Sequence, residues 1–337
     1  KTELMKVVLY GLLNKKYKGT SILVLDPHGE FAREIRRLDI LAKNLDNFVY
    51  IDPTLKEGYT PVFNPFDIKD KGEFSLSYSV DSFLGAFDQL LKKNLNITGS
   101  MSYLLRPCIH TLLYHDNMTM PDLLTMTQAI GNARKYKGTD NLSDKEKRMF
   151  DLGLSVPDEM IRNFFEDGWN HVDMRTIPAV MSRIGGILNH PLVKRFVSGK
   201  KNTFDLESYL NKGKIVVVNL DFTRLGDDGS EAIGRLLVSE LQNISARRSR
   251  IRERKKRPRT VVFIDECQRF VSASIEKALS EFSKFNTSLF LAHQYVQQID
   301  DGMLKAMLSN SENKIIGRNS SATMKAVAPD LGNEVST

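Results

Sequence analysis

The first 72 residues alternate between helical and strand-like hydrophobic patterns. Residues 1–18 carry apolar side chains at helical spacing, and residues 31–46 fit a second amphipathic helix. Residues 21–25 form a continuous apolar run, typical of a strand buried on both faces of a parallel sheet, and residues 48–51 predict another strand. This β-α-β order predicts a parallel, doubly wound α/β sheet.

The pattern changes in the middle of the chain and then returns. Strand signals almost vanish between residues 73 and 200, where helices are predicted at 80–93, 102–114, 120–130, 144–154, 157–168 and 177–188. Beyond residue 200, strands are predicted at 214–220, 260–264, 289–291 and 314–316, with a helix at 229–250. We therefore expect an α/β core built from residues 1–72 and 201–337, with an all-helical insertion at 73–200.

Size and composition agree with an ordinary globular protein. The chain has 337 residues, which favours a large domain with an insertion or two domains. Its two cysteines make a disulfide framework unnecessary and favour a reducing compartment. No stretch approaches the roughly 18 apolar residues of a membrane helix. Because the chain opens at Lys1, without a signal-peptide pattern, we expect a piece of a longer protein, whose upstream part carries any membrane anchor.

Two acids follow the apolar run at 261–264. Asp265 and Glu266 come where ligands bind in an open parallel sheet, beyond the carboxyl ends of the strands. The first acid is suited to hold Mg²⁺, and the second to accept a proton from, or orient, an attacking water. This is a Walker B pattern with an adjacent catalytic glutamate. The alternative is a pair of acids that end a strand simply by facing solvent.

The opening pair Lys1-Thr2 is the candidate partner of these acids. A phosphate-binding loop ends in Gly-Lys-Ser/Thr, and no such glycine-rich loop lies within the chain. Lys1 and Thr2 are nevertheless followed by an amphipathic helix and a buried strand, as the end of such a loop would be. In that interpretation Lys1 reaches the β- and γ-phosphates and Thr2 binds Mg²⁺. Without that helix and strand, the pair would carry no weight.

Polar residues also follow two other predicted strands. In Asp26-Pro27-His28-Gly29-Glu30, proline ends the strand and glycine permits a tight turn, so that three ionisable side chains project from the sheet edge. His293 and Gln294 follow the strand at 289–291, and Gln294 is suited to sense a γ-phosphate through a water. An ordinary polar turn is the alternative for each.

Together these motifs resemble the HerA/FtsK class of ring ATPases, and most of all the conjugative coupling proteins and related type IV secretion ATPases of the TraG-like branch. The resemblance is carried, in order, by Lys1-Thr2, Asp26-Pro27-His28-Gly29-Glu30, Asn64-Pro65-Phe66, the helical insertion, the strand ending at Asn219-Leu220, Asp265-Glu266 and Ala292-His293-Gln294. It implies a RecA-like P-loop NTPase core. It also implies a homo-hexameric ring that hydrolyses ATP with Mg²⁺ and pulls DNA through its channel.

The resemblance assigns roles to individual residues. Lys1 and Thr2 bind phosphate, Thr2 and Asp265 hold Mg²⁺, and Glu266 activates water. Gln294 senses the nucleotide, while Asp26 and Glu30 lie near it. An arginine from the neighbouring subunit stabilises the transferred phosphoryl group, with Arg318 as first choice and Arg183 and Arg195 as second.

Several functions remain compatible with these motifs. Besides a conjugative DNA translocase, they fit a type IV secretion ATPase that drives protein transfer, a HerA-like DNA helicase, and a non-catalytic module that only docks DNA or partners. Secretion-channel or relaxase-type proteins are further candidate partners. The expected location is the cytoplasm, at the inner face of the membrane if an upstream anchor exists.

One short block accounts for the basic charge of the chain. Lys and Arg number 48 and Asp and Glu 41, for a net charge of +7. Residues 247–259 hold nine basic residues and one acid, a net +8, which leaves about −1 for the remainder. The block is a candidate DNA-binding segment through Arg247, Arg248, Arg250, Arg252, Arg254, Lys255, Lys256 and Arg257. A solvated loop or a contact with anionic lipid are the alternatives.

Overall fold

The structure is a computed structural model. It describes residues 1–14, 19–42, 45–56, 58–90, 98–270, 279, 281–299, 301–317, 323–324 and 327–328. Packing divides the chain into two compact units, one formed by Lys1–Asp52 with Asp205–Thr337 and the other by Pro53–Phe204. The domain boundaries expected from the sequence, at 72/73 and 200/201, stay a prediction. We describe each unit by itself.

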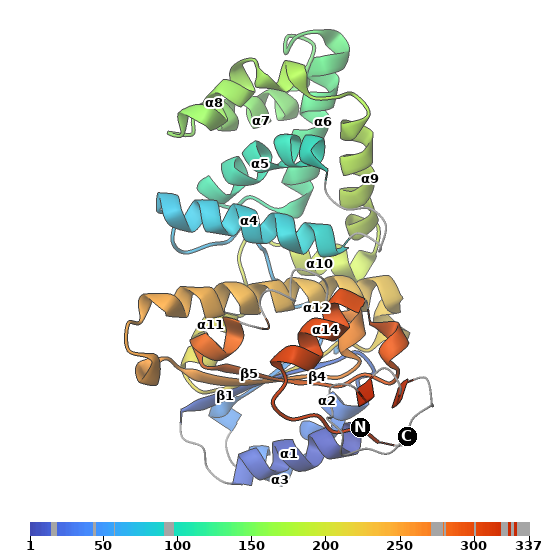
Figure 1. Ribbon diagram of the computed structural model, residues 1–337. Coiled ribbons are helices and arrows are strands. Elements are labelled where there is room, and N and C mark those ends of the chain that lie inside the picture. Colours follow the sequence, from blue (N-terminus) through green and yellow to red (C-terminus); the bar gives the residue numbers. More distant parts are fainter. Residues whose placement is uncertain are drawn as a thin grey trace. The chain divides into compact units, whose positions relative to one another are not determined.

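The first unit is built around a sheet of five parallel strands (Figure 1). Its order is β2 (Phe48–Ile51), β3 (Ile215–Asn219), β1 (Thr20–Asp26), β4 (Arg259–Ile264) and β5 (Thr287–Leu291). All four pairings are parallel, so every strand ends at the same edge. The parallel α/β sheet expected from the apolar runs is therefore confirmed.

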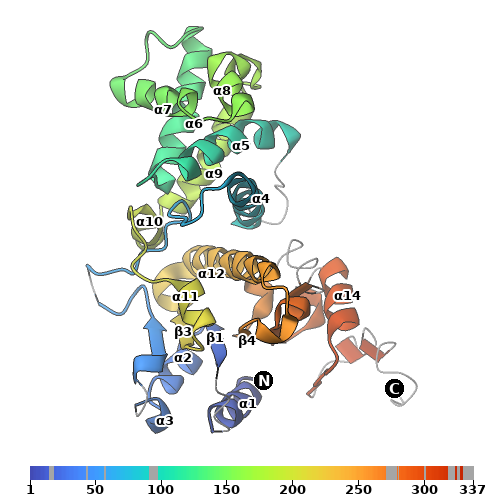
Figure 2. The same cartoon turned by 90° about the vertical axis from the view of Figure 1, so that its left-hand side faces the viewer.

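Helices cover both faces of this sheet (Figures 1 and 2). One face carries α1 (Thr2–Asn14), α2 (Glu30–Ile35) and α3 (Asp39–Ala42), and the other carries α12 (Phe222–Arg247). Successive side chains of a strand point to opposite faces, and β1 is buried from Ser21 to Asp26 because both faces are covered. The core beneath α1 to α3 contains Met5, Leu9, Ile22, Val24, Phe31, Ile35, Val217 and Phe263.

In the part that the structure describes, the first unit contains two further α-helices, and it lacks one strand that the sequence predicted. The unit also contains α11 (Leu206–Asn211) and α14 (Asp301–Asn310). Residues 314–316, expected to be a strand, lie in none. That apolar stretch is only two residues long, and Ile315 is largely exposed, so it has no buried face to pair. The prediction of that strand was wrong.

The second unit consists of helices. They are α4 (Glu73–Leu90), α5 (Gly99–Tyr114), α6 (Met120–Tyr136), α7 (Asp144–Leu154), α8 (Glu159–Glu166), α9 (Thr176–Leu188) and α10 (Pro191–Ser198). No strand occurs in this unit among the residues that the structure describes. Local signals set the helix starts, as in α7, where Ser143 and Glu146 form a reciprocal capping box.

Asn64, from the Asn-Pro-Phe motif, ties two distant segments of the second unit together. Its side chain is buried and donates to the carbonyl oxygens of Met118 at 2.7 Å and Lys200 at 3.2 Å. Its backbone N–H donates to Asn202 Oδ1 at 2.6 Å, and its own Oδ1 accepts from the N–H of Phe66 at 3.0 Å. Asn64 therefore links the segment that enters the helical unit to the segment that leaves it.

Candidate functional site

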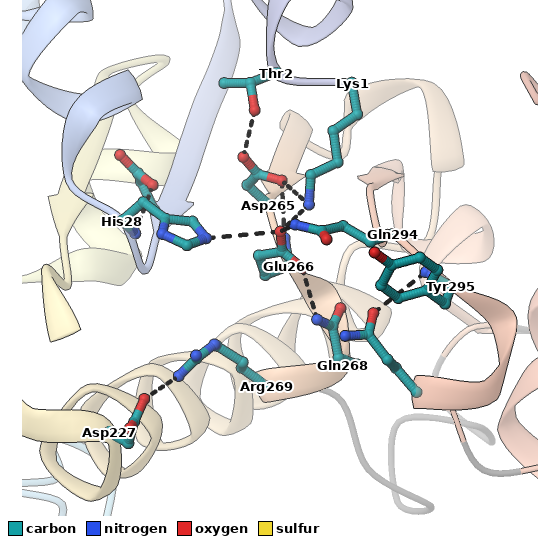
Figure 3. Close-up of polar contacts among 12 residues, drawn as sticks. Lys1, Thr2, His28, Asp227, Asp265, Glu266, Gln268, Arg269, Gln294 and Tyr295 are labelled. Carbon is teal, nitrogen blue, oxygen red and sulfur yellow. Dashed lines mark hydrogen bonds and ion pairs between the residues drawn. The ribbon is translucent and has the colours of Figure 1, made fainter. Parts of the chain in front are cut away.

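The two ends of the predicted site meet at the carboxyl edge of the sheet, although more than 260 positions separate them in the sequence (Figure 3). Lys1 Nζ lies 3.2 Å from Asp265 Oδ1 and also contacts Glu266 Oε1. Thr2 Oγ1 donates to Asp265 Oδ2 at 2.9 Å. Because α1 begins at Thr2 and β4 ends at Ile264, the start of a helix and the end of a strand position the four side chains.

Glu266 lies at the centre of the cluster and is 3% exposed. Its backbone is left-handed, with φ 46°, a region that a residue with a side chain seldom adopts. Gln294 Nε2 donates to its Oε1 at 2.8 Å, and His28 Nε2 lies 3.6 Å from the same oxygen. Gln268 Nε2 donates to the other oxygen, Oε2, at 2.6 Å. The carboxylate is thus held from several sides (Figure 3).

These contacts keep Glu266 ionised. Burial alone would raise the pKa of its carboxyl group, but hydrogen bonds from Gln268, Lys1 and Gln294, together with the charge of Lys1, lower that pKa to about 2. A carboxylate with so low a pKa is ionised at neutral pH, but it is a weak base while these donors remain on it.

Asp26 supports the turn after β1 and does not open onto the cluster. It is fully buried, and its carboxylate accepts the backbone N–H of His28 at 3.0 Å and of Ala32 at 2.8 Å. Burial raises the pKa of the Asp26 carboxyl group, and it outweighs these backbone hydrogen bonds, which act to lower that pKa. The turn needs Gly29, whose φ is +75° and where a Cβ atom would lie 2.6 Å from Asn219 Oδ1.

Glu30 and three arginines are the other residues that the sequence predicted to bind or act on the nucleotide. Glu30 is exposed at the first position of α2, outside the cluster that surrounds Glu266. His28, and not Glu30, is the residue of the turn after β1 that approaches Glu266. Arg318 lies outside the described residues. Arg183 in α9 and Arg195 in α10 belong to the helical unit. The roles of all these residues stay predictions.

Gln268 is the member of the cluster that the sequence did not identify. Gln268 lies two residues after Glu266. In a helix residues i and i+2 do not face each other, and in a strand they share a face but lie about 6.6 Å apart. The left-handed backbone of Glu266 and the 3₁₀ turn Cys267–Arg269 bring the two side chains together here. A second amide close to the acid pair was the available signal, and it is a weak one.

The basic block lies at the opposite edge of the sheet, because it leads into β4 and ends at Arg259, the first residue of that strand. Arg248 is 2% exposed, and its guanidinium donates to Asn211, Thr260 and Thr287 at 2.9–3.2 Å. Burial lowers its pKa to about 10, so it remains charged at neutral pH. Arg248 therefore braces the fold and does not present its charge at the surface.

The other members of the block differ in their contacts. Arg247 pairs with Glu240 at 2.7 Å and Glu207 at 3.0 Å, which neutralises its charge locally. Arg257 is half-buried and donates to the carbonyl oxygen of Ile251 at 2.9 Å. The exposed members are Arg250, Arg252, Arg254, Lys255, Lys256 and Arg259. DNA binding by this block stays a prediction, and the exposed members are the ones that are placed to make it.

A parallel sheet with a Lys-Thr pair and an acid pair at its carboxyl edge has the architecture of a P-loop NTPase core. The family model described as "Type IV secretory system Conjugative DNA transfer" matches residues 7–334. The chain belongs to this family, which confirms the conjugation and type IV secretion class expected from its motifs.

Solved structures give the same fold. VirB4 of Thermoanaerobacter pseudethanolicus superposes with a TM-score of 0.56 at 15% identity, covering 99% of this chain and 78% of that chain. The unbound conjugative coupling protein TrwB has a TM-score of 0.49 at 16% identity, covering 92% and 64%. TrwB in complex with ADP and Mg²⁺ has 0.47 at 14%, covering 92% and 65%. The chain thus spans slightly less than two thirds of TrwB, and the VirB4 match confirms the RecA-like fold.

No curated protein sequence matches the chain. Among the described residues, no helix has the length and apolar character needed to cross a membrane.

Proposed function

We propose that this protein is an ATPase that drives DNA transfer in conjugation. The observation that carries the proposal is the meeting of Lys1 and Thr2 with Asp265 and Glu266 at one edge of the sheet. A phosphate-binding lysine, a metal-binding hydroxyl and two acids are the groups that phosphoryl transfer from ATP requires. The family supports the direction of the proposal, because its description names conjugative DNA transfer.

The donor set fits a nucleotide with Mg²⁺. Thr2 Oγ1 and Asp265 Oδ2 lie 2.9 Å apart, and a hydroxyl beside a carboxylate suits the oxygen coordination of that ion. Mg²⁺, when bound, neutralises charge on the β- and γ-phosphate oxygens. TrwB, a structural neighbour, has been solved in complex with ADP and Mg²⁺. Lys1 is placed to move from the two carboxylates onto the phosphates.

Glu266 acts on the attacking water. Its Oε1 accepts a proton as the water oxygen bonds to the γ-phosphorus, and the bond from that phosphorus to the bridging oxygen breaks to release ADP. Gln294, which donates to the same Oε1 at 2.8 Å, is placed to respond when the γ-phosphate arrives or leaves. Movement of Gln294 and Lys1 away from Oε1 frees that oxygen for the water.

Phosphate release by the full-length protein tests the proposal. We expect hydrolysis of ATP with Mg²⁺, and a loss of about 10²–10⁴-fold in kcat for Glu266→Gln, the range of general-base catalysis. Glu34→Gln, a change of an exposed acid on α2, is the matched control and should hydrolyse at the native rate. Native activity in Glu266→Gln would show that another group activates the water.

The effect of DNA on the rate of ATP hydrolysis distinguishes a DNA-transfer ATPase from the alternative functions. We expect single- or double-stranded DNA to raise the hydrolysis rate, and the protein to assemble as a hexameric ring in light-scattering measurements with nucleotide. ATPase activity that is indifferent to DNA, together with binding of secretion-channel proteins, would favour an ATPase for protein transfer. DNA binding without any hydrolysis would favour a docking module.

A further inference from the structure

The side-chain amide of Gln268 is hydrogen-bonded to Glu266. Its amide nitrogen donates to Glu266 Oε2 at 2.6 Å, a short distance for a hydrogen bond to a charged acceptor. The amide is oriented with nitrogen toward the carboxylate because an ionised carboxylate only accepts. The carbonyl oxygen of Gln268 is buried and has no hydrogen-bond partner among the described residues.

The turn that carries Gln268 is anchored on both sides. Before it, the N–H of Cys267 donates to the carbonyl oxygen of Ala292 at 2.8 Å, which joins the turn to the end of β5. After it, Arg269 pairs with Asp227 at 2.6 Å and lies over the ring of Phe222, 4.8 Å from its centroid. A side chain on a backbone held in this way has a defined reach.

The two oxygens of Glu266 face different partners (Figure 3). Oε1 meets Lys1, Gln294 and His28, which come from the start of α1 and from the loops after β5 and β1. Oε2 meets Gln268, two residues further along the chain. A carboxylate can rotate about its last bond, and its two oxygens are chemically equivalent. The hydrogen bond from Gln268 to one oxygen therefore fixes the plane of the group and leaves the other oxygen, here Oε1, toward Lys1.

We propose that Gln268 is a positioning residue that fixes the carboxylate of Glu266 with Oε1 toward the attacking water. This role rests on the proposed ATPase function and extends it. When Lys1 and Gln294 turn to the nucleotide, they leave Oε1. Gln268 then continues to orient the acid by its short hydrogen bond to Oε2, while His28 Nε2 lies further away, 3.6 Å from Oε1. Gln268 is not expected to touch ATP itself, so it acts through Glu266 alone.

The test removes the hydrogen-bond donor of Gln268 and keeps the size and shape of its side chain. Gln268→Met has a similar length and volume but no N–H group, so Oε2 loses its partner. Gln298→Met is the matched control, because Gln298 is the same residue type nearby and accepts the N–H of Tyr295 at 3.2 Å without contacting Glu266. Both variants are made in the full-length protein.

Kinetics separate positioning from a general structural effect. We expect Gln268→Met to lower kcat by about 10- to 100-fold, the cost of losing a hydrogen bond to a charged group or of a displaced catalytic group. Affinity for a non-hydrolysable ATP analogue should stay within about twofold of native, because the nucleotide contacts remain. Gln298→Met should leave kcat and affinity unchanged. Native kcat in Gln268→Met, or a loss confined to affinity, would overturn the inference.

Crystal structures supply an outcome that does not depend on hydrolysis. The native protein should keep the Gln268–Glu266 hydrogen bond, and in Gln268→Met the carboxylate of Glu266 should rotate while the turn Cys267–Arg269 stays in place. An unmoved carboxylate in the variant would refute the positioning role. If the native protein hydrolysed no ATP yet the carboxylate rotated as expected, the proposed function would fail and the orienting contact would stand.

Discussion

Gly234 allows a close contact that the site depends on. A Cβ atom added at Gly234, in the middle of α12, would lie 2.3 Å and 2.4 Å from two ring carbons of Phe270. Phe270 is fully buried and directly follows the turn that carries Gln268. A methyl group at Gly234 would therefore have to displace this ring, and with it the turn that precedes Phe270.

Two opposing effects set the size of the change in Gly234→Ala. Alanine improves helix propensity by about 1 kcal/mol over glycine. Overpacking of a filled core costs about 1–3 kcal/mol, and a contact this short against a buried ring belongs in the upper part of that range. We expect a net destabilisation of about 1–2 kcal/mol, which lowers Tm by about 2–4 °C per kcal/mol for a unit of this size.

The control is a glycine in a helix where a methyl group fits. A Cβ at Gly185 in α9 meets nothing within 4 Å, so Gly185→Ala should stabilise the helical unit by the propensity gain alone. Thermal melts compare the variants, each at the transition of the unit that carries it, and phosphate release should show a lower kcat for Gly234→Ala. The reasoning would be refuted if Gly234→Ala raised Tm as Gly185→Ala does. Adding Phe270→Leu should restore part of the lost stability.

Three further changes test separate parts of the chain. Asp265→Asn should abolish Mg²⁺-dependent phosphate release, and full activity across a Mg²⁺ titration would contradict its metal role. Reversing the exposed Arg252 and Lys255 to Glu should weaken DNA binding and reduce the log–log salt slope in anisotropy titrations by about two, whereas an unchanged slope would place the DNA elsewhere. Burial raises the pKa of Glu146, but hydrogen bonds from its capping partner and Asn132 outweigh burial and lower it below 4.5. Its ionised form therefore stabilises the fold above the unfolded-state pKa, and this contribution disappears as pH falls through the lower folded-state pKa. Glu146→Gln should thus cost about 0.3–1 kcal/mol at pH 7 and progressively less as the pH falls below 4.5 in pH-dependent melts, and a Tm difference that does not change with pH would exclude this linkage.

The sequence predicted the α/β core because its strands are buried on both faces. Residues 21–25 and 260–264 are nearly all apolar, as a sheet covered by helices on each side requires. Their carboxyl ends lie at one edge in any parallel arrangement, so topology predicted that Asp265 and the start of the helix leading into β1 share that edge, whereas the contact of Thr2 with Asp265 also requires β1 and β4 to be neighbours. The strand order, with β3 between β2 and β1, depends on long-range packing that no local pattern carries.

Other features depend on local backbone geometry that the sequence does not reveal. Nothing in the run of nine basic residues indicated that the Arg248 side chain turns inward, since the helix ends within the run and continues as a 3₁₀ turn. The same is true of Gln268, which reaches its partner only because Glu266 takes a left-handed conformation. Buried polar contacts of this kind are specified by the assembled core and not by residue spacing.

Helix α12 connects the two edges of the sheet. At the carboxyl edge, the ring of its first residue, Phe222, has its centroid 5.2 Å from that of the His28 ring, and the Arg269 guanidinium lies over the same ring. Its last residue, Arg247, is the first residue of the basic block. From Asp227, after the break at Gly226, to Arg247 the helix spans about 30 Å at 1.5 Å per residue. Phe270 packs on Gly234 in the middle of this helix. When the turn after Glu266 is displaced, Phe270 therefore pushes on α12, and the other end of α12 carries the basic block. The effect of Gly234→Ala should therefore extend beyond local stability, and DNA-stimulated hydrolysis should fall more than basal hydrolysis.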